Sequence, residues 1–187
     1  MRIGVDLGGT KTEALALDDT GRELRRIRVS TPQQDYPGTV RTIASLVQDL
    51  ERELGKQGTV GVGIPGTIVA ATGLVKNANS TWLNGQPLQR DLSSALSREV
   101  RCANDANCFA ISEATDGAAV GAEVVFGVIM GTGCGGGGPT YFADGRMMRL
   151  SATCSSRFAH QPITRLDANV GVNSSRGSPQ WSITTPA

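Results

Sequence analysis

The chain has 187 residues, enough for one domain of ordinary size or for a domain plus a fragment of another. Its 18 basic and 17 acidic residues nearly cancel, so the overall charge predicts neither a nucleic-acid partner nor a membrane surface. The N-terminus lacks a signal-peptide pattern, and no apolar run approaches the roughly 18 residues of a membrane span. We therefore expect a cytoplasmic protein without a membrane partner.

Glycine and cysteine usage narrow the expected chemistry. The 24 glycines exceed the average use of about 7%, which indicates special backbone geometry or close approach to a ligand. The four cysteines contain no Cys-x-x-Cys pair, so neither a disulfide scaffold nor a zinc site is predicted. The single histidine, His160, cannot form a metal cluster alone.

The first motif follows a short apolar strand at residues 3–5 and reads DLGGTKT at residues 6–12. Residues 13–17 alternate at period two, which predicts a second strand and not the helix that a P-loop or a dinucleotide fingerprint requires. A carboxylate, two glycines and a hydroxyl at such a turn suit a hairpin that binds a nucleotide phosphate. Asp6 would hold Mg²⁺ there, directly or through water. A plain tight hairpin is the alternative.

The next elements alternate between strands and helices. Residues 23–29 predict a third strand with a charged face, and residues 30–38 a loop. Apolar residues at helical spacing then predict an amphipathic helix over 40–54, which Gly55 ends. Residues 60–64 predict a short apolar strand, closed by a Pro-Gly turn of the kind that presents backbone to a ligand.

Two polar segments follow. The sequence NANSTWLNG at residues 77–85 is suited to binding sugar hydroxyls, because asparagine both donates and accepts; an ordinary turn-rich loop is the alternative. A helix capped by Asp91 and a strand at 100–102 come next. Asn104 and Asp105 then stand between that strand and an Ala-rich helix at 108–119. α/β folds place chemistry at such junctions, although Asp105 could also simply cap the helix.

The most apolar run of the chain, residues 124–130, predicts a central strand. It leads into the sequence GTGCGGGG at residues 131–138, a second Gly-rich loop that contains a hydroxyl. Two such loops, each following a strand, resemble the two halves of a phosphate clamp.

These segments occur in the order found in the ROK sugar kinases, and the chain resembles that family, with bacterial fructokinases and mannokinases the nearest in pattern. The motifs are DLGGTK at 6–11, GIPG at 63–66, NANSTW at 77–82, NDAN at 104–107 and GTGCGG at 131–136. The resemblance covers the N-terminal part of such a kinase. It implies an α/β fold of the actin-like ATPase (ribonuclease H-like) type, with the second domain largely missing.

The resemblance also implies a reaction, the ATP-dependent phosphorylation of a hexose of the fructose, mannose or glucose type, with ATP and Mg²⁺ as cofactors. Asp105 would be the general base that takes the proton from the attacking sugar hydroxyl. The sugar would be bound by Gly66, Asn79, Asn104 and Asp105. The nucleotide phosphates would be bound by Gly9, Thr10 and Lys11 on one side and by Thr132 and Gly133 on the other, with Asp6 at the metal.

After Gly137 the family pattern decays, so we predict an N-terminal kinase domain at 1–137 and an aberrant, poorly ordered tail at 138–187. Counted without gaps, His160 falls where the family has a histidine, and is a candidate sugar or metal ligand or else a solvated surface residue. Arg157 falls where the family has a sugar-binding glutamate. Either compensating frameshifts or coincidence would produce such a mixture of retained and lost family residues. The zinc site of the family is not expected in this chain.

The predicted tail limits the expected activity. A chain that ends at Ala187 would lack the domain that closes over ATP, so we expect little or no phosphoryl transfer from it alone. A non-catalytic sugar-binding protein or an inactive truncated kinase fragment is therefore the alternative. A homodimer is expected if the missing region is restored, and the sequence leaves open which hexose is bound.

Overall fold

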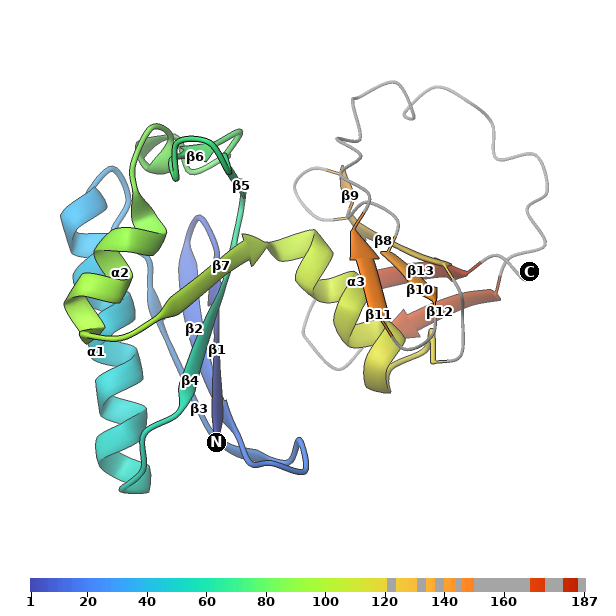
Figure 1. The fold of residues 1–187 in the computed structure, drawn as a ribbon, viewed down its shortest axis with the longest axis horizontal. Coiled ribbons are helices and arrows are strands. Elements are labelled where there is room, and N and C mark those ends of the chain that lie inside the picture. The colour runs from blue at the N-terminus through green and yellow to red at the C-terminus, as the bar shows by residue number, and fades with distance from the viewer. Residues whose placement is uncertain are drawn as a thin grey trace. The chain divides into compact units, whose positions relative to one another are not determined.

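A computed structural model describes residues 1–120 and, beyond them, strands at 124–130, 134–136, 140–143, 146–149, 169–173 and 180–184. The chain divides into two compact units, Met1–Asp105 and Ala106–Ala187 (Figure 1). The predicted phosphate residues Thr132 and Gly133 lie outside the described residues, as does His160.

The first unit is built on a five-stranded sheet in the order β3-β2-β1-β4-β7. Its strands are β1 (Arg2–Leu7), β2 (Lys11–Leu17), β3 (Glu23–Ser30), β4 (Thr59–Ile64) and β7 (Val100–Asn104). The first three form an antiparallel meander, whereas β4 runs parallel to β1, and β7 parallel to β4. The carboxyl ends of β1, β4 and β7 therefore meet at one end of the sheet, where open α/β sheets bind ligands.

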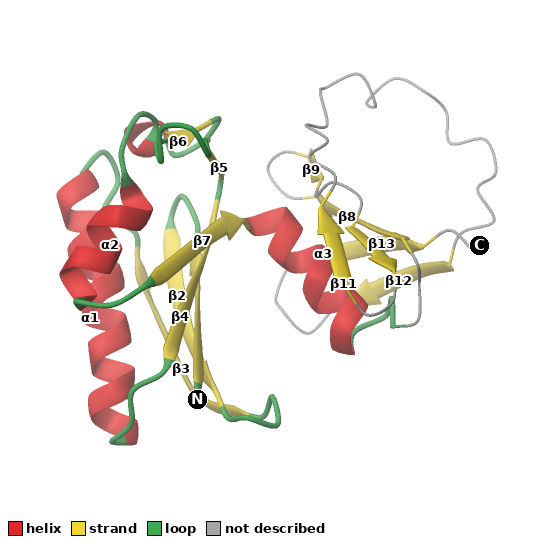
Figure 2. Cartoon of the chain, viewed as in Figure 1, coloured by secondary structure: helices red, strands yellow, loops and turns green. Residues whose placement is uncertain are grey.

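One face of this sheet forms the core. Along β1 the buried residues alternate with exposed ones, which is the pattern of a strand covered on one side. Helices α1 (Tyr36–Leu54) and α2 (Leu88–Leu96) supply the covering layer (Figure 2). The least exposed large side chains of the core are Leu7, Ile43, Leu50, Ile64, Leu83, Leu88 and Leu92.

Helix α1 ends where the sequence predicts but begins earlier. Gly55 adopts a left-handed conformation with φ of 63° and caps the last turn, as predicted. The first residue is Tyr36, so the prediction of a loop through residue 38 was wrong at this end. The reason is local, because an Asp35 carboxylate oxygen accepts the Gly38 N–H at 2.8 Å and Pro37 occupies the first turn.

Short elements connect β4 to β7. Strands β5 (Thr67–Ile68) and β6 (Val75–Lys76) pair antiparallel, and a 3₁₀ turn η1 (Thr81–Leu83) lies within the segment predicted as a polar loop. Helix α2 begins at Leu88, ahead of the predicted cap at Asp91, because its apolar face starts there: Leu88 and Leu92 are both completely buried.

The two outer strands of the sheet are protected in different ways. On β7, the backbone N–H of Val100 donates to Ser93 Oγ at 3.1 Å and that of Cys102 to Gln89 Oε1 at 2.9 Å, both acceptors belonging to α2. On β3, Arg26 forms ion pairs with Glu13 and Glu23. Hydrogen-bonding groups of one outer strand are thus satisfied by a helix, and the other strand is lined with charge.

The second unit consists of α3 (Asp105–Asp116), whose first residue belongs to the first unit, and of a sheet in the order β11-β10-β8-β13-β12, with β9 also paired to β8. These strands are β8 (Val124–Met130), β9 (Cys134–Gly136), β10 (Thr140–Ala143), β11 (Arg146–Arg149), β12 (Asn169–Asn173) and β13 (Gln180–Thr184). The predicted central strand is confirmed as β8. Residues 138–187 are described only in part, so the boundary at 137 and the aberrant tail stay predictions.

Within the described part of the chain, no helix has both the length and the apolar composition that crossing a membrane requires.

Candidate functional site

The turn between β1 and β2 has the geometry of an anion-binding hairpin. The Gly8 N–H donates to the Lys11 carbonyl at 3.0 Å, and a Cβ on Gly8 would lie only 2.7 Å from that same oxygen, so the turn requires glycine. Gly9, Thr10 and Lys11 are exposed at its tip. The turn can therefore present backbone N–H groups, a hydroxyl and an ammonium group to a phosphate.

Two buried threonines hold this turn in place. Thr31 Oγ1 donates to the Gly8 carbonyl at 2.8 Å, and lies 2.8 Å from Thr12 Oγ1. Since a hydroxyl has one proton, Thr12 must be the donor in the second bond. The Thr31 N–H also donates to the Thr10 carbonyl at 2.9 Å. Sequence reasoning missed Thr31, whose only local signal is its place in a Ser-Thr-Pro loop.

Two carboxylates flank the end of β4. Asp6 is exposed near the end of β1 and pairs in register with Gly63. A Cβ on Gly63 would lie 3.8 Å from Asp105 Cα. Asp105, which directly follows β7, is therefore also close to Gly63, on the side of β4 opposite to β1. Magnesium is commonly bound by one or two carboxylates together with substrate phosphates and water, and the oxygen donors present here fit that pattern.

The predicted base is oriented by its neighbour. Asn104 Nδ2 donates to Asp105 Oδ1 at 3.0 Å and to the Gly66 carbonyl at 3.1 Å. One amide group therefore joins the ends of β4 and β7 and fixes one oxygen of the Asp105 carboxylate. The structure thus brings together three of the four predicted sugar-binding residues.

The fourth, Asn79, is exposed on the loop that packs against Gly66. A Cβ on Gly66 would lie 3.0 Å from Ala78 Cβ and 2.8 Å from the Lys76 carbonyl oxygen, so only glycine allows the loop this close. Ser80 is buried, and a Cβ on Gly9 would lie 3.4 Å from its hydroxyl oxygen. The loop that carries Asn79 is therefore adjacent to both the hairpin turn and Gly66.

Trp82, the aromatic residue of this loop, is half-buried against the core. Its indole N–H donates to Thr39 Oγ1 on α1 at 3.2 Å. The indole therefore supports the loop from beneath. A surface pocket lined by β3 and α1, including Asp35, Arg41 and Asp49, contains none of the predicted site residues.

Comparison with protein families gives one match that extends over most of the chain. A family model described as the ROK family matches residues 2–163. The match therefore runs beyond residue 137, into the range predicted to be the tail.

Similar proteins include bacterial sugar kinases. An N-acetyl-D-glucosamine kinase from Yersinia pestis is 46% identical over 169 residues, which are 89% of this chain and 65% of the relative. The chain thus spans somewhat less than two thirds of that relative. Its name gives no support to the expected similarity to fructokinases and mannokinases.

Two solved structures resemble the chain in three dimensions. A ROK hexokinase from Thermus thermophilus is 32% identical with a TM-score of 0.64, over 80% of this chain and 49% of that one. A ROK family glucokinase from Streptomyces griseus, in complex with glucose and AMPPNP, is 28% identical with a TM-score of 0.69, over 87% of this chain and 51% of that one. The likeness confirms the predicted α/β fold of the actin-like type.

Proposed function

Since the chain belongs to the ROK family, we propose that it phosphorylates a hexose with ATP as the phosphoryl donor, and that the hexose is N-acetyl-D-glucosamine. The names of the curated relatives support this sugar, and the glucose and AMPPNP of the Streptomyces griseus glucokinase support the pair of ligands. Of the fructose, mannose and glucose types of hexose expected from the sequence, the proposal keeps only the glucose type, because N-acetyl-D-glucosamine is a derivative of glucose.

The proposal rests mainly on the hydrogen bonds that connect Gly66, Asn104 and Asp105. The Asn104 amide donates to the Gly66 carbonyl and to one oxygen of the carboxylate, so the base has a fixed orientation at the carboxyl end of β7. Asn79 is exposed on the loop that packs on Gly66. Fixed polar groups of this kind suit recognition of a polyhydroxylated substrate.

Asp105 would act as the general base. Its carboxylate takes the proton from a sugar hydroxyl as that oxygen forms a bond to the γ-phosphorus of ATP and the bond from phosphorus to the β,γ-bridging oxygen breaks. ADP leaves with the electron pair of that bond. Phosphoryl transfer of this type depends mainly on positioning and charge stabilisation, which Asn104 and the Gly-rich turns would provide.

The exposed residues Gly9, Thr10 and Lys11 would bind the phosphates through the hairpin turn, and Thr132 and Gly133 through the second Gly-rich loop. Asp6 would hold Mg²⁺, directly or through water, and the bound cation would neutralise negative charge on the phosphates. The Lys11 ammonium adds a second positive charge at the same turn.

A coupled assay of ADP release tests the proposal with the 187-residue chain. We expect N-acetyl-D-glucosamine to give a higher kcat/KM than glucose, mannose or fructose. Asp105→Asn should lower kcat by about 10²- to 10⁴-fold, because it removes the base while keeping the side-chain shape. A preference for fructose or mannose, or an unchanged rate in Asp105→Asn, would contradict the proposal.

A second candidate is sugar binding without phosphoryl transfer. All four predicted sugar-binding residues belong to the unit Met1–Asp105, so this candidate requires no residue of the second Gly-rich loop. Isothermal titration with N-acetyl-D-glucosamine separates the two candidates. Saturable binding without ADP release at any enzyme concentration favours the second, and the absence of both binding and release overturns both.

A further inference from the structure

We infer that Asn84 is a positioning residue for sugar binding. Its side chain fixes the sugar loop, defined as residues 77–80, in the conformation that presents Asn79 and seats Ala78 on Gly66. This inference rests on the proposed function of the site. It assigns to Asn84 a role in holding the loop, which differs from the direct binding of sugar hydroxyls predicted for residues 77–85.

Asn84 binds both backbone polar groups of one residue. Its Oδ1 accepts the Ala78 N–H at 2.9 Å, and its Nδ2 donates to the Ala78 carbonyl at 3.0 Å. The pair of bonds reproduces what a neighbouring strand would offer, although the two residues are only six positions apart. Ala78 is 5% exposed, so its backbone polar groups are shielded from water on their own side, whereas Asn84 is exposed.

Ala78 is the residue of the sugar loop that packs on Gly66. Its Cα and Cβ would lie 3.1 Å and 3.0 Å from a Cβ on Gly66. The Gly66 carbonyl in turn accepts the Asn104 amide, which also donates to Asp105. A direct series of contacts therefore runs from Asn84 through Ala78 and Gly66 to the proposed base.

The sugar loop needs a restraint at this point. Asn77, just before Ala78, has a positive φ of 57°, a conformation that is unusual for residues other than glycine. Asn79, just after it, is exposed. The direction of the Ala78 backbone therefore sets the direction of Asn79, and the Asn84 amide is the side chain that fixes that backbone.

Backbone hydrogen bonds hold the turn that carries Asn84. Its backbone N–H donates to the Thr81 carbonyl at 3.1 Å, and the N–H of the following Gly85 donates to the Val75 carbonyl at 2.8 Å. Only a carboxamide provides a donor and an acceptor side by side, because a carboxylate lacks the donor and a hydroxyl cannot span both groups. Asparagine at this position is thus matched to the task.

The test compares Asn84→Ala and Asn84→Asp with wild type. Asn84→Ala should weaken N-acetyl-D-glucosamine binding by about 10- to 100-fold, the range that loss of a hydrogen bond from Asn79 to the sugar would give, and should leave the Kd for AMPPNP within about twofold. Asn84→Asp keeps the acceptor for the Ala78 N–H and should lose less affinity than Asn84→Ala. Titration calorimetry supplies both Kd values.

Thr72→Ala is the matched control. Like Asn84→Ala, it removes a hydrogen bond between a side chain and the backbone. The bond lies in the turn between β5 and β6, where Thr72 Oγ1 accepts the Leu74 N–H at 3.3 Å. This variant should bind the sugar like wild type. If Asn84→Ala also binds like wild type, the inference is wrong; if wild type itself binds no sugar, the proposed function fails and the inference fails with it.

Amide exchange keeps the inference testable even if Asn84→Ala does not fold. In wild type, the Ala78 N–H should exchange slowly with solvent by NMR. It should stay protected in Asn84→Asp, where the acceptor is retained. Fast exchange of this amide in wild type would overturn the inference independently of any binding measurement.

Discussion

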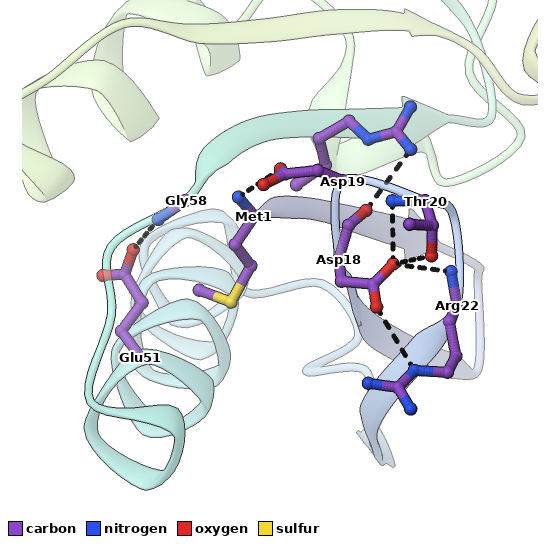
Figure 3. A network of polar contacts seen from close by, with 8 residues as sticks. Met1, Asp18, Asp19, Thr20, Arg22, Glu51 and Gly58 are labelled. Atoms are coloured by element: carbon purple, nitrogen blue, oxygen red, sulfur yellow. Dashed lines mark hydrogen bonds and ion pairs between the residues drawn. The ribbon is translucent and has the colours of Figure 1, made fainter.

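Asp18, in the turn between β2 and β3, organises that turn through a single carboxylate (Figure 3). Oδ1 accepts from the Thr20 hydroxyl at 2.6 Å, the Thr20 N–H at 2.9 Å and the Arg22 N–H at 3.0 Å. Oδ2 accepts from Arg22 Nε at 3.2 Å. The hydrogen bond from the Thr20 side chain, with smaller effects of the two backbone N–H groups and Arg22, lowers the pKa of Asp18 to about 2.

The lowered pKa predicts how acid affects stability. The ordinary pKa is 3.8, so the ionised Asp18 carboxylate favours the folded state above pH 3.8, and this contribution is lost as the pH falls toward about 2. Asp18→Ala should therefore lower Tm at neutral pH, and its difference from wild type should shrink as the pH approaches about 2. Thermal melts across this pH range measure the effect.

Glu53→Ala provides the comparison, because Glu53 pairs with Arg25 on the surface, where both side chains are about half exposed (49% and 50%). Such a pair adds little stability, and its removal should change Tm only slightly. A Tm difference for Asp18→Ala that is constant from neutral pH to about pH 2 would rule out the assigned role of this carboxylate.

Among the elements, the end of β3 supports the turn between β1 and β2. Thr31 follows β3 directly and donates to the Gly8 carbonyl, while Thr12 donates to Thr31. Thr12 is completely buried and Thr31 is 5% exposed. The hairpin that we propose for phosphate binding is therefore held by a neighbouring strand as well as by its own glycines.

Thr31→Val should destabilise the fold by about 1–3 kcal/mol, because it leaves the Gly8 carbonyl and the Thr12 hydroxyl without this partner. It should also weaken AMPPNP binding by loosening the turn. The double variant Thr12→Val with Thr31→Val should cost less than the sum of the single variants, since the unsatisfied Thr12 hydroxyl is then absent. Urea denaturation of the four proteins gives the coupling, and strict additivity would exclude the shared bond.

The elements that the sequence predicts well are those with a long hydrophobic repeat or a clear terminator. The apolar face of α1 and its glycine cap are visible over several turns. The start of α1 depends on one capping bond from Asp35, and β5 and β6 have two residues each, too few for a periodic signal. These features are fixed by tertiary contacts that local patterns do not contain.

The residues of the candidate site also divide into those that local sequence patterns reveal and those that only tertiary contacts reveal. Gly8, Gly66 and Asp105 stand in recognisable motifs, and each has a steric or hydrogen-bonding reason to be that residue. Thr31 and Asn84 act through bonds that cross 23 and six positions of the chain, and neither spacing corresponds to a helical or strand period. Residues that support a site are therefore harder to predict than those that form it.

Over the chain as a whole, the predicted sugar-binding and phosphate-binding residues are unequally distributed between the two units. The four sugar residues and the hairpin turn belong to the unit Met1–Asp105, whereas Thr132 and Gly133 belong to the range Ala106–Ala187. Changes at the second Gly-rich loop and changes at the four sugar residues should therefore have separable effects on the two ligands.

Thr132→Val should weaken AMPPNP binding and leave the Kd for N-acetyl-D-glucosamine unchanged. Gly66→Ala should weaken N-acetyl-D-glucosamine binding and leave the Kd for AMPPNP unchanged. The reason is that the new Cβ would collide with the Lys76 carbonyl at 2.8 Å and displace Ala78. Titration of each variant with each ligand measures the separation. An equal loss of sugar affinity in both variants would show that the second Gly-rich loop also shapes the sugar site.

The protection of the outer strands has a consequence for self-association. Strand addition by another chain requires free backbone groups along an outer strand, and on β7 the N–H groups of Val100 and Cys102 are already bonded to α2. On β3, an incoming strand would meet the charges of Arg25, Arg26 and Arg28. The sheet of the first unit is therefore a poor template for amyloid-like growth, and the strand that ends in Asn104 is shielded from invasion by a foreign strand.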